Sequence, residues 1–152
     1  IIMASPVHNG FTTGLMNAFV ERATWTLVRP TGEIMGLKGF PEPRLLAKAR
    51  ASASIVSAGM VPNELRQYCD TGTPWMKEMA EMLFNGEFIG DIYAGAIFTK
   101  ELKYDEWNRA YFFRELTEGQ LQEAFDLGMR VARAVKSGKV RPYESAAPGT
   151  SG

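Results

Sequence analysis

The stretch that decides the fold is Ile1-Ile2-Met3-Ala4, followed by Ser5-Pro6-Val7-His8-Asn9-Gly10 and then by residues 11–23. Four apolar residues in a row are typical of the end of a buried strand. The next six include Pro, Asn and Gly, which favour a turn. Thr12 and Thr13 then predict the cap of a helix with apolar positions at Leu15, Met16, Phe19, Val20 and Ala23. Strand, loop and helix N-terminus in this order form anion and cofactor sites in α/β sheets.

The composition indicates a globular domain, and its balanced charge gives no sign of a highly charged partner such as nucleic acid. The chain has 152 residues, and its 17 basic and 17 acidic residues cancel. It therefore lacks the basic footprint of a nucleic-acid-binding protein. No stretch approaches the roughly 20 apolar residues that span a bilayer. The single cysteine, Cys69, excludes an internal disulfide and predicts no metal site, and it favours a reducing compartment such as the cytoplasm.

The chain begins without Met and inside an apolar run that reads as a buried strand. We interpret residues 1–140 as the C-terminal portion of one domain whose first strands precede Ile1, and residues 141–152, rich in Pro, Gly, Ser and Ala, as a flexible tail. The alternative is a processed chain whose first strand starts at this residue.

Two more strands and three more helices follow in the pattern. Residues 51–60 and 88–98 are predicted strands, and residues 63–69 a short helix. Thr73 at the N-cap and Pro74 after it predict a helix that ends at Asn85-Gly86. Its predicted apolar face is Trp75, Met76, Met79, Ala80 and Leu83. Strands that alternate with helices predict an α/β fold with a parallel sheet.

The last helix carries the clearest start signal. Thr117 and Gln120 predict a capping box, and Leu116 with Leu121 a hydrophobic staple. The predicted buried stripe is Leu121, Ala124, Phe125, Gly128, Val131, Ala132 and Val135.

Two segments show no periodic spacing of apolar residues. Thr26–Arg50, with its several Pro and Gly residues, is interpreted as a lid or interface arm, with a helical turn near Pro43–Ala49 as an alternative. Thr99–Glu115 is rich in aromatic residues and is interpreted as a lid or a subunit contact.

The opening stretch resembles a known family. Ser5-Pro6-Val7-His8-Asn9-Gly10, followed by Leu15-Met16-Asn17-Ala18-Phe19-Val20-Glu21-Arg22, is similar to the third strand and flavin loop of flavodoxin-fold NAD(P)H-dependent FMN reductases, a pattern shared with iron–sulfur flavoproteins and quinone reductases. Residues 54–59 resemble the family's fourth strand, and residues 124–128 its last helix. The chain departs from the family pattern at three positions. His8 stands where the family usually has Tyr, Asn17 where it often has Lys, and Ala4 where it often has Gly.

The resemblance implies a flavodoxin-like, doubly wound, three-layer α/β/α fold that binds FMN beside strand ends. The cofactor-binding residues it implies are Ser5, Pro6, Val7, His8, Asn9, Gly10, Phe11, Thr12, Thr13, Ser57, Ala58 and Gly59. His8 is the candidate hydrogen-bond or proton donor near the flavin. An FMN phosphate loop is expected before Ile1, and an iron–sulfur cluster there stays an open alternative.

The implied activity is transfer of hydride from NAD(P)H to FMN and on to a quinone, a flavin, a metal or a similar acceptor. The alternatives are a flavodoxin-type electron carrier and an interaction domain that has lost FMN. A cytoplasmic homodimer or homotetramer is expected, with Thr26–Arg50 and Tyr104–Phe113 as candidate contacts. His8, Asn9 and Gly10 have a simpler reading as turn residues, residues 57–59 as a strand exit and Cys69 as an inert thiol.

Overall fold

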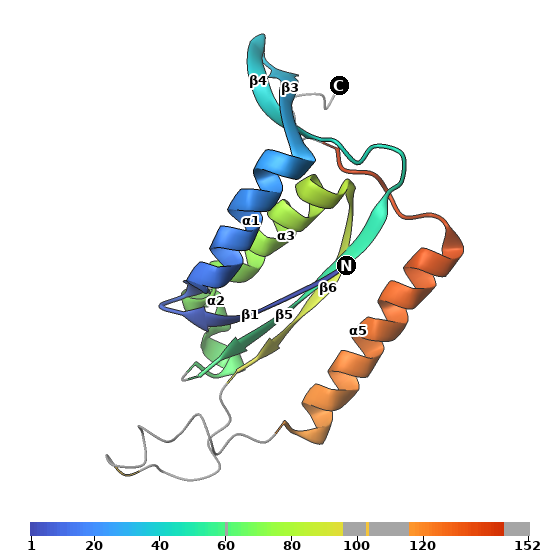
Figure 1. Ribbon diagram of the computed structural model, residues 1–152. Coiled ribbons are helices and arrows are strands. Elements are labelled where there is room, and N and C mark those ends of the chain that lie inside the picture. The colour runs from blue at the N-terminus through green and yellow to red at the C-terminus, as the bar shows by residue number, and fades with distance from the viewer. Residues whose placement is uncertain (60, 96–102, 104–115, 145–152) are drawn as a thin grey trace.

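The computed structural model describes residues 1–59, 61–95, 103 and 116–144. A four-stranded sheet with the order β2-β1-β5-β6 forms its centre (Figure 1). The parallel strands are β1 (Ile2–His8), β5 (Arg50–Ala58) and β6 (Gly86–Ala94), and the short β2 (Phe11–Thr12) returns antiparallel to the end of β1. The prediction of an α/β fold is confirmed, and the mixed, mostly parallel sheet is compatible with a flavodoxin-like fold.

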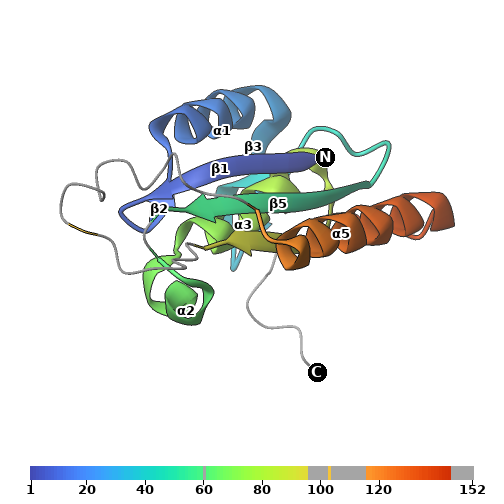
Figure 2. The ribbon, with the colours of Figure 1, turned by 90° about the horizontal axis from the view of Figure 1, so that it is seen from below.

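Helices cover both faces of the sheet. α1 (Gly14–Leu27) and α3 (Gly72–Phe84) lie on one side, and α5 (Glu118–Ser137) lies on the other, over β5 and β6 (Figures 1 and 2). The short η1 (Asn63–Leu65) and α2 (Arg66–Cys69) follow β5, as residues 63–69 predicted. The carboxyl ends of β1 and β5 therefore meet η1 and α2 at one edge of the sheet.

The larger core lies between the sheet and the α1–α3 layer. The predicted face of α3 is confirmed, with Met76, Ala80 and Leu83 buried. The predicted face of α1 is partly wrong, because Leu15 and Phe19 are 84% and 50% exposed. The residues of α1 that pack into this core are Met16, Val20, Ala23 and Leu27, one helical stripe rotated from the predicted one.

The start of α3 differs from the sequence expectation as well. The helix begins at Gly72, and Asp70 supplies the capping carboxylate by accepting from the Thr73 backbone N–H at 2.9 Å and from the Thr73 hydroxyl at 2.6 Å. The prediction of Thr73 as the N-cap is wrong, because a carboxylate three residues earlier is the stronger acceptor. The predicted end at Asn85 is confirmed by its left-handed backbone, φ +50°.

α5 begins at the predicted capping box, in which Thr117 and Gln120 bond reciprocally. Its predicted buried stripe is wrong except for Val131, which is partly buried, and Leu127 is the buried residue of the helix. Leu127 and Val131 pack on Ala53 and Ile92 of the sheet. The predicted staple pair, Leu116 and Leu121, is 62% and 54% exposed, so it buries little surface.

Most of the segment 26–50 is a β-hairpin, residues 28–43, instead of an irregular connection. β3 (Val28–Ile34) and β4 (Leu37–Pro43) pair antiparallel around Met35-Gly36 and extend away from the sheet (Figure 1). Their Pro and Gly residues lie in a two-stranded, register-shifted ribbon that tolerates them. Residues 44–49 are bends and a turn instead of a helix. The hairpin's role as an interface arm stays a prediction.

The third parallel strand is described to Ala94, whereas residues 96–98 of the prediction lie outside the described part, as do Tyr104–Phe113 and residues 145–152. At the start of the predicted tail, the Arg141 guanidinium donates to Glu87 at 2.7 Å, and the Tyr143 N–H donates to Asn85 at 3.2 Å. This arginine lowers the pKa of the Glu87 carboxyl. Within the described residues, none of the helices has the length and apolarity that a membrane span requires.

Candidate functional site

A cavity of about 800 Å³ opens where β1 and β5 end. One wall is the end of β1 with its turn, Pro6–Gly10, and a second is the end of β5, residues 57–59. The two parallel strands end side by side, about 5 Å apart as neighbouring strands are, because Pro6 pairs with Ser57 and Val7 with Ala58. The strand register therefore brings two predicted segments, about fifty residues apart in sequence, into one site.

The turn that borders the cavity is a two-residue hairpin connection. Asn9 and Gly10 both have positive φ, +52° and +80°, and His8 pairs with Phe11 across them. Positive φ at both central residues is the signature of the type I′ turn, which Asn-Gly strongly favours. The reading of these two residues as turn formers therefore holds, and the turn itself places His8 and Asn9 at the cavity.

Gly10 also packs closely against the segment that follows α2. The Thr71 N–H and hydroxyl both donate to the Gly10 carbonyl at 2.8 Å. A Cβ at Gly10 would lie 2.8 Å from the Cys69 carbonyl oxygen. Glycine is required here by the protein's own packing, in addition to any approach of a ligand.

Four of the residues implied by the resemblance lie behind the turn and are not among those that line the cavity: Ser5, Phe11, Thr12 and Thr13. The Ser5 hydroxyl accepts from the Thr13 N–H at 3.2 Å, and the Thr13 hydroxyl caps α1 by accepting from Met16. Buried Thr12 donates to Asn17, and Phe11 packs on Trp75 with ring centroids 5.1 Å apart. These residues fix the turn on α1 and α3.

The third wall was not predicted as part of the site. It consists of Val61, Tyr68, Cys69 and Thr71, which come from the segment after β5 and from α2. The available signal was a predicted short helix, residues 63–69, soon after a strand end at the edge where α/β sheets bind ligands. Tyr68 is 77% exposed, so a large aromatic ring stands at the cavity without burial in the core.

The described lining of the cavity carries no carboxylate, ammonium or guanidinium group. His8 contributes the one imidazole of this lining, a group that can donate or accept a hydrogen bond. The Asn9 amide, the Cys69 thiol, and apolar, hydroxyl and backbone groups make up the rest. Such a lining suits a neutral, planar heterocycle with a few hydrogen-bonding edges, and it does not suit a phosphate, which requires basic groups or clustered N–H donors. Among the described residues there is also no cluster of three His, Cys, Asp or Glu side chains for a metal ion.

Comparisons of the chain with protein-family models, with curated proteins and with solved structures found no significant match.

Proposed function

We propose that this chain carries the flavin-ring site of an FMN-dependent NAD(P)H oxidoreductase, which passes hydride from nicotinamide to the flavin and on to a quinone, a flavin, a metal or a similar acceptor. The observation that carries the proposal is the cavity itself. It is lined by eight of the twelve residues that the resemblance implies: Pro6, Val7, His8, Asn9, Gly10, Ser57, Ala58 and Gly59.

The chemistry of the lining supports a ring site. FMN would supply the hydride acceptor, and the protein would bind and orient its ring. Pro6, Val7 and Ala58 would provide apolar contact to the ring, and the backbone groups of the turn and the His8 side chain would offer it hydrogen bonds. The uncharged lining favours the ring of FMN over its phosphate.

The first test is FMN titration of the natural-length protein, followed by absorbance and flavin fluorescence, together with NAD(P)H oxidation. We expect His8→Ala and Tyr68→Ala each to weaken FMN binding about tenfold, because each removes one direct contact. Gln67→Ala is the matched control, since Gln67 is an exposed neighbour on α2 that does not line this cavity.

The outcomes of this test separate the alternatives. Retained flavin with steady NAD(P)H consumption supports the reductase. Retained flavin without NAD(P)H consumption would make the chain an electron carrier. A protein that retains no flavin and oxidises no NAD(P)H contradicts the proposal and favours an interaction domain.

We further propose that the complete domain is a three-layer flavodoxin-like fold, in which further strands pair with β1. The outer edge of β1 pairs only at Val7 and His8, with β2, among the described residues. On the α5 side of the sheet, Ile2 is 56% exposed, and Ala4 and Pro6 are exposed beside it. α5 presents Leu121, Phe125 and Val135 at 54%, 63% and 56% exposure. Apolar surface of this extent usually marks a covered face.

Phe125→Asp tests this completed fold in the natural-length protein. If a further element of the completed fold packs against α5, the substitution should lower the free energy of unfolding by about 2 kcal/mol or more, because it places a charge in an apolar contact. Leu37→Asp on the hairpin is the matched control, with a similarly exposed side chain (66%) away from the sheet. Equal, small effects of the two changes in urea unfolding would contradict the proposal. A loss that depends on protein concentration would assign the cover to a second copy.

A further inference from the structure

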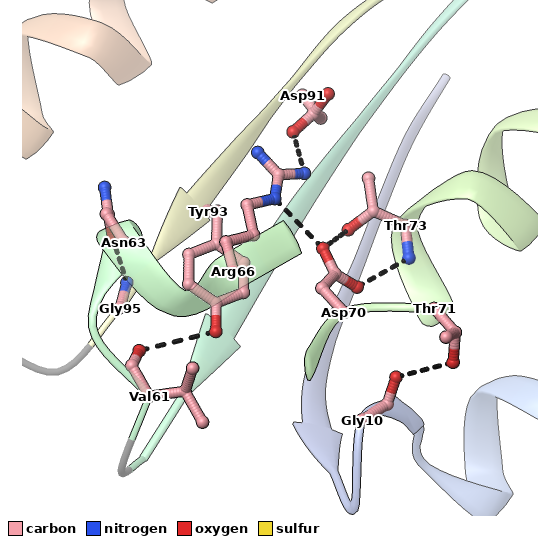
Figure 3. A network of polar contacts seen from close by, with 10 residues as sticks. All are labelled: Gly10, Val61, Asn63, Arg66, Asp70, Thr71, Thr73, Asp91, Tyr93 and Gly95. Carbon is pink, nitrogen blue, oxygen red and sulfur yellow. Dashed lines mark hydrogen bonds and ion pairs between the residues drawn. The ribbon is translucent and has the colours of Figure 1, made fainter. Parts of the chain in front are cut away.

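A network centred on Arg66 lies on α2, the helix that forms the third wall of the cavity. The Arg66 guanidinium donates through Nε to Asp70 at 3.1 Å and through Nη2 to Asp91 on β6 (Figure 3). It also lies over the ring of Tyr93, 5.0 Å from the ring centroid. One side chain therefore joins α2 to two carboxylates and to an aromatic ring of the core strand β6.

This network is better shielded from solvent than a surface ion pair. The side chain of Asp70 is 2% exposed, and those of Asp91 and Arg66 are 26% and 32% exposed. Burial lowers the pKa of Arg66, but its hydrogen bonds and charge interactions with Asp91 and Asp70 raise it by more, and the pKa lies above its ordinary value. A buried carboxylate that loses its cation is strongly destabilising, so the position of Asp70 depends on Arg66.

The residues around Asp70 connect the network to the cavity. Tyr68 and Cys69 line the cavity, Asp70 accepts from Arg66 and Thr73, and Thr71 donates to Gly10 of the turn. The four consecutive residues 68–71 thus form part of the cavity wall, accept the ion pair with Arg66, cap α3 and bond to the turn. Figure 3 shows the contacts of Asp70 with Arg66 and Thr73 and the contact of Thr71 with Gly10.

The start of the same segment is fastened to β6 and the residue after it. The Tyr93 hydroxyl donates to the Val61 carbonyl at 3.4 Å, and the Gly95 N–H donates to the Asn63 side chain at 3.0 Å. A Cβ at Gly95 would lie 2.4 Å from that side-chain oxygen. α2 has only four residues and cannot hold its own position by helix formation. Its placement therefore depends on these contacts to neighbouring elements.

We propose that Arg66 is a positioning residue: from outside the cavity, it holds the wall formed by Tyr68 and Cys69 against the turn at Gly10, through Asp70 and Asp91. Loss of Arg66 releases the wall locally, while the sheet and the core stay folded. The consequence for FMN binding rests on the function proposed above. The positioning itself does not require a flavin and can be measured without one.

Cys69 provides the measurement, because it is the single cysteine of the chain and lies in the wall. We expect Arg66→Met to raise the rate of Cys69 labelling by a thiol reagent, without flavin, at least about fivefold, because local opening further exposes a thiol that is only partly exposed in the closed wall. Arg141→Met is the matched control. It makes the same chemical change and breaks an ion pair with Glu87 on β6, away from the cavity, and should leave the labelling rate unchanged.

The urea dependence of the labelling rate distinguishes local opening of the wall from a general loss of stability. If the wall opens locally, labelling of Arg66→Met is fast and nearly independent of low urea concentrations, whereas opening by global unfolding accelerates steeply with urea. Arg66→Lys keeps the charge and should restore part of the wild-type rate. If Arg66→Met does not fold, the same measurement is made on Asp91→Asn. We expect Asp91→Asn to raise the rate of Cys69 labelling at low urea concentrations.

The proposal is overturned if folded Arg66→Met, or Asp91→Asn used in its place, is labelled at the wild-type rate. It is also overturned if Arg141→Met raises the labelling rate as much as Arg66→Met does. In a separate measurement, Arg66→Met should weaken FMN binding about tenfold, with Arg141→Met unchanged. A wild-type protein that binds no FMN contradicts the proposed function alone, since the labelling result still tests the position of the wall.

Discussion

Replacing Gly86 with alanine is expected to lower the free energy of unfolding by about 3 kcal/mol or more, a loss large enough to abolish folding of a marginally stable domain. Gly86 opens β6 opposite Arg50, the first residue of β5. A Cβ there would lie 1.8 Å from the Arg50 carbonyl oxygen and 2.8 Å from the carbonyl carbon. These are backbone atoms of a paired strand, so they cannot move aside as a flexible side chain could. Urea unfolding followed by circular dichroism measures the effect.

Gly128→Ala is the control for this prediction. Gly128 lies within α5, and a Cβ there meets no heavy atom within 4 Å. We expect a gain of about 0.5 to 1 kcal/mol, because alanine has the higher helix propensity. If the two substitutions change stability equally, the close approach of β6 to β5 at Gly86 is not as the structure shows it.

Replacing Gly10 with alanine is the second large effect, and it falls on the candidate site. Its φ of +80° disfavours a side chain, and the new Cβ would lie 2.8 Å from the Cys69 carbonyl oxygen. We expect a loss of about 2 kcal/mol in stability. We also expect FMN binding to weaken at least about tenfold, because the turn and the α2 wall can no longer close on each other. Unfolding by urea and flavin titration give the two quantities.

The chain contains a matched control for Gly10 in its second hairpin. Met35 and Gly36 have φ of +53° and +79°, nearly the values of Asn9 and Gly10, and a Cβ at Gly36 meets nothing within 4 Å. Gly36→Ala should therefore cost only the backbone strain, about 1 kcal/mol. The difference between the two substitutions isolates the contact with Cys69. No difference, in stability and in FMN binding, would contradict the role assigned to Gly10.

Local signals predicted much of the fold correctly. The predicted strands 51–60 and 88–98 cover all but the first one or two residues of β5 and of the described β6, and the capping box at Thr117 marks the start of α5. These features depend on neighbours in the sequence, such as a hydroxyl three residues from an N–H. The same holds for the Asn9-Gly10 turn, whose conformation follows from two residues.

Local sequence signals did not predict the β3–β4 hairpin or which faces of α1 and α5 are buried. Proline and glycine in β3 and β4 suppress strand patterns, although a two-stranded ribbon with free edges tolerates them. On α5, two adjacent apolar stripes exist, and the sequence does not reveal which one meets the sheet. The structure places Leu127 inside and leaves Phe125 exposed.

For the candidate site, the sequence by itself determined the two strand ends, Pro6–Gly10 and residues 57–59, because the chemistry of a turn and a strand exit is local. Only the tertiary structure decided that Tyr68 and Cys69 face the same cavity, that Ser5 and Thr13 are not part of its lining, and that Arg66 bonds to Asp70 next to the third wall. Those facts depend on strand register and on contacts between residues distant in sequence, such as Arg66 with Asp91 and Thr71 with Gly10.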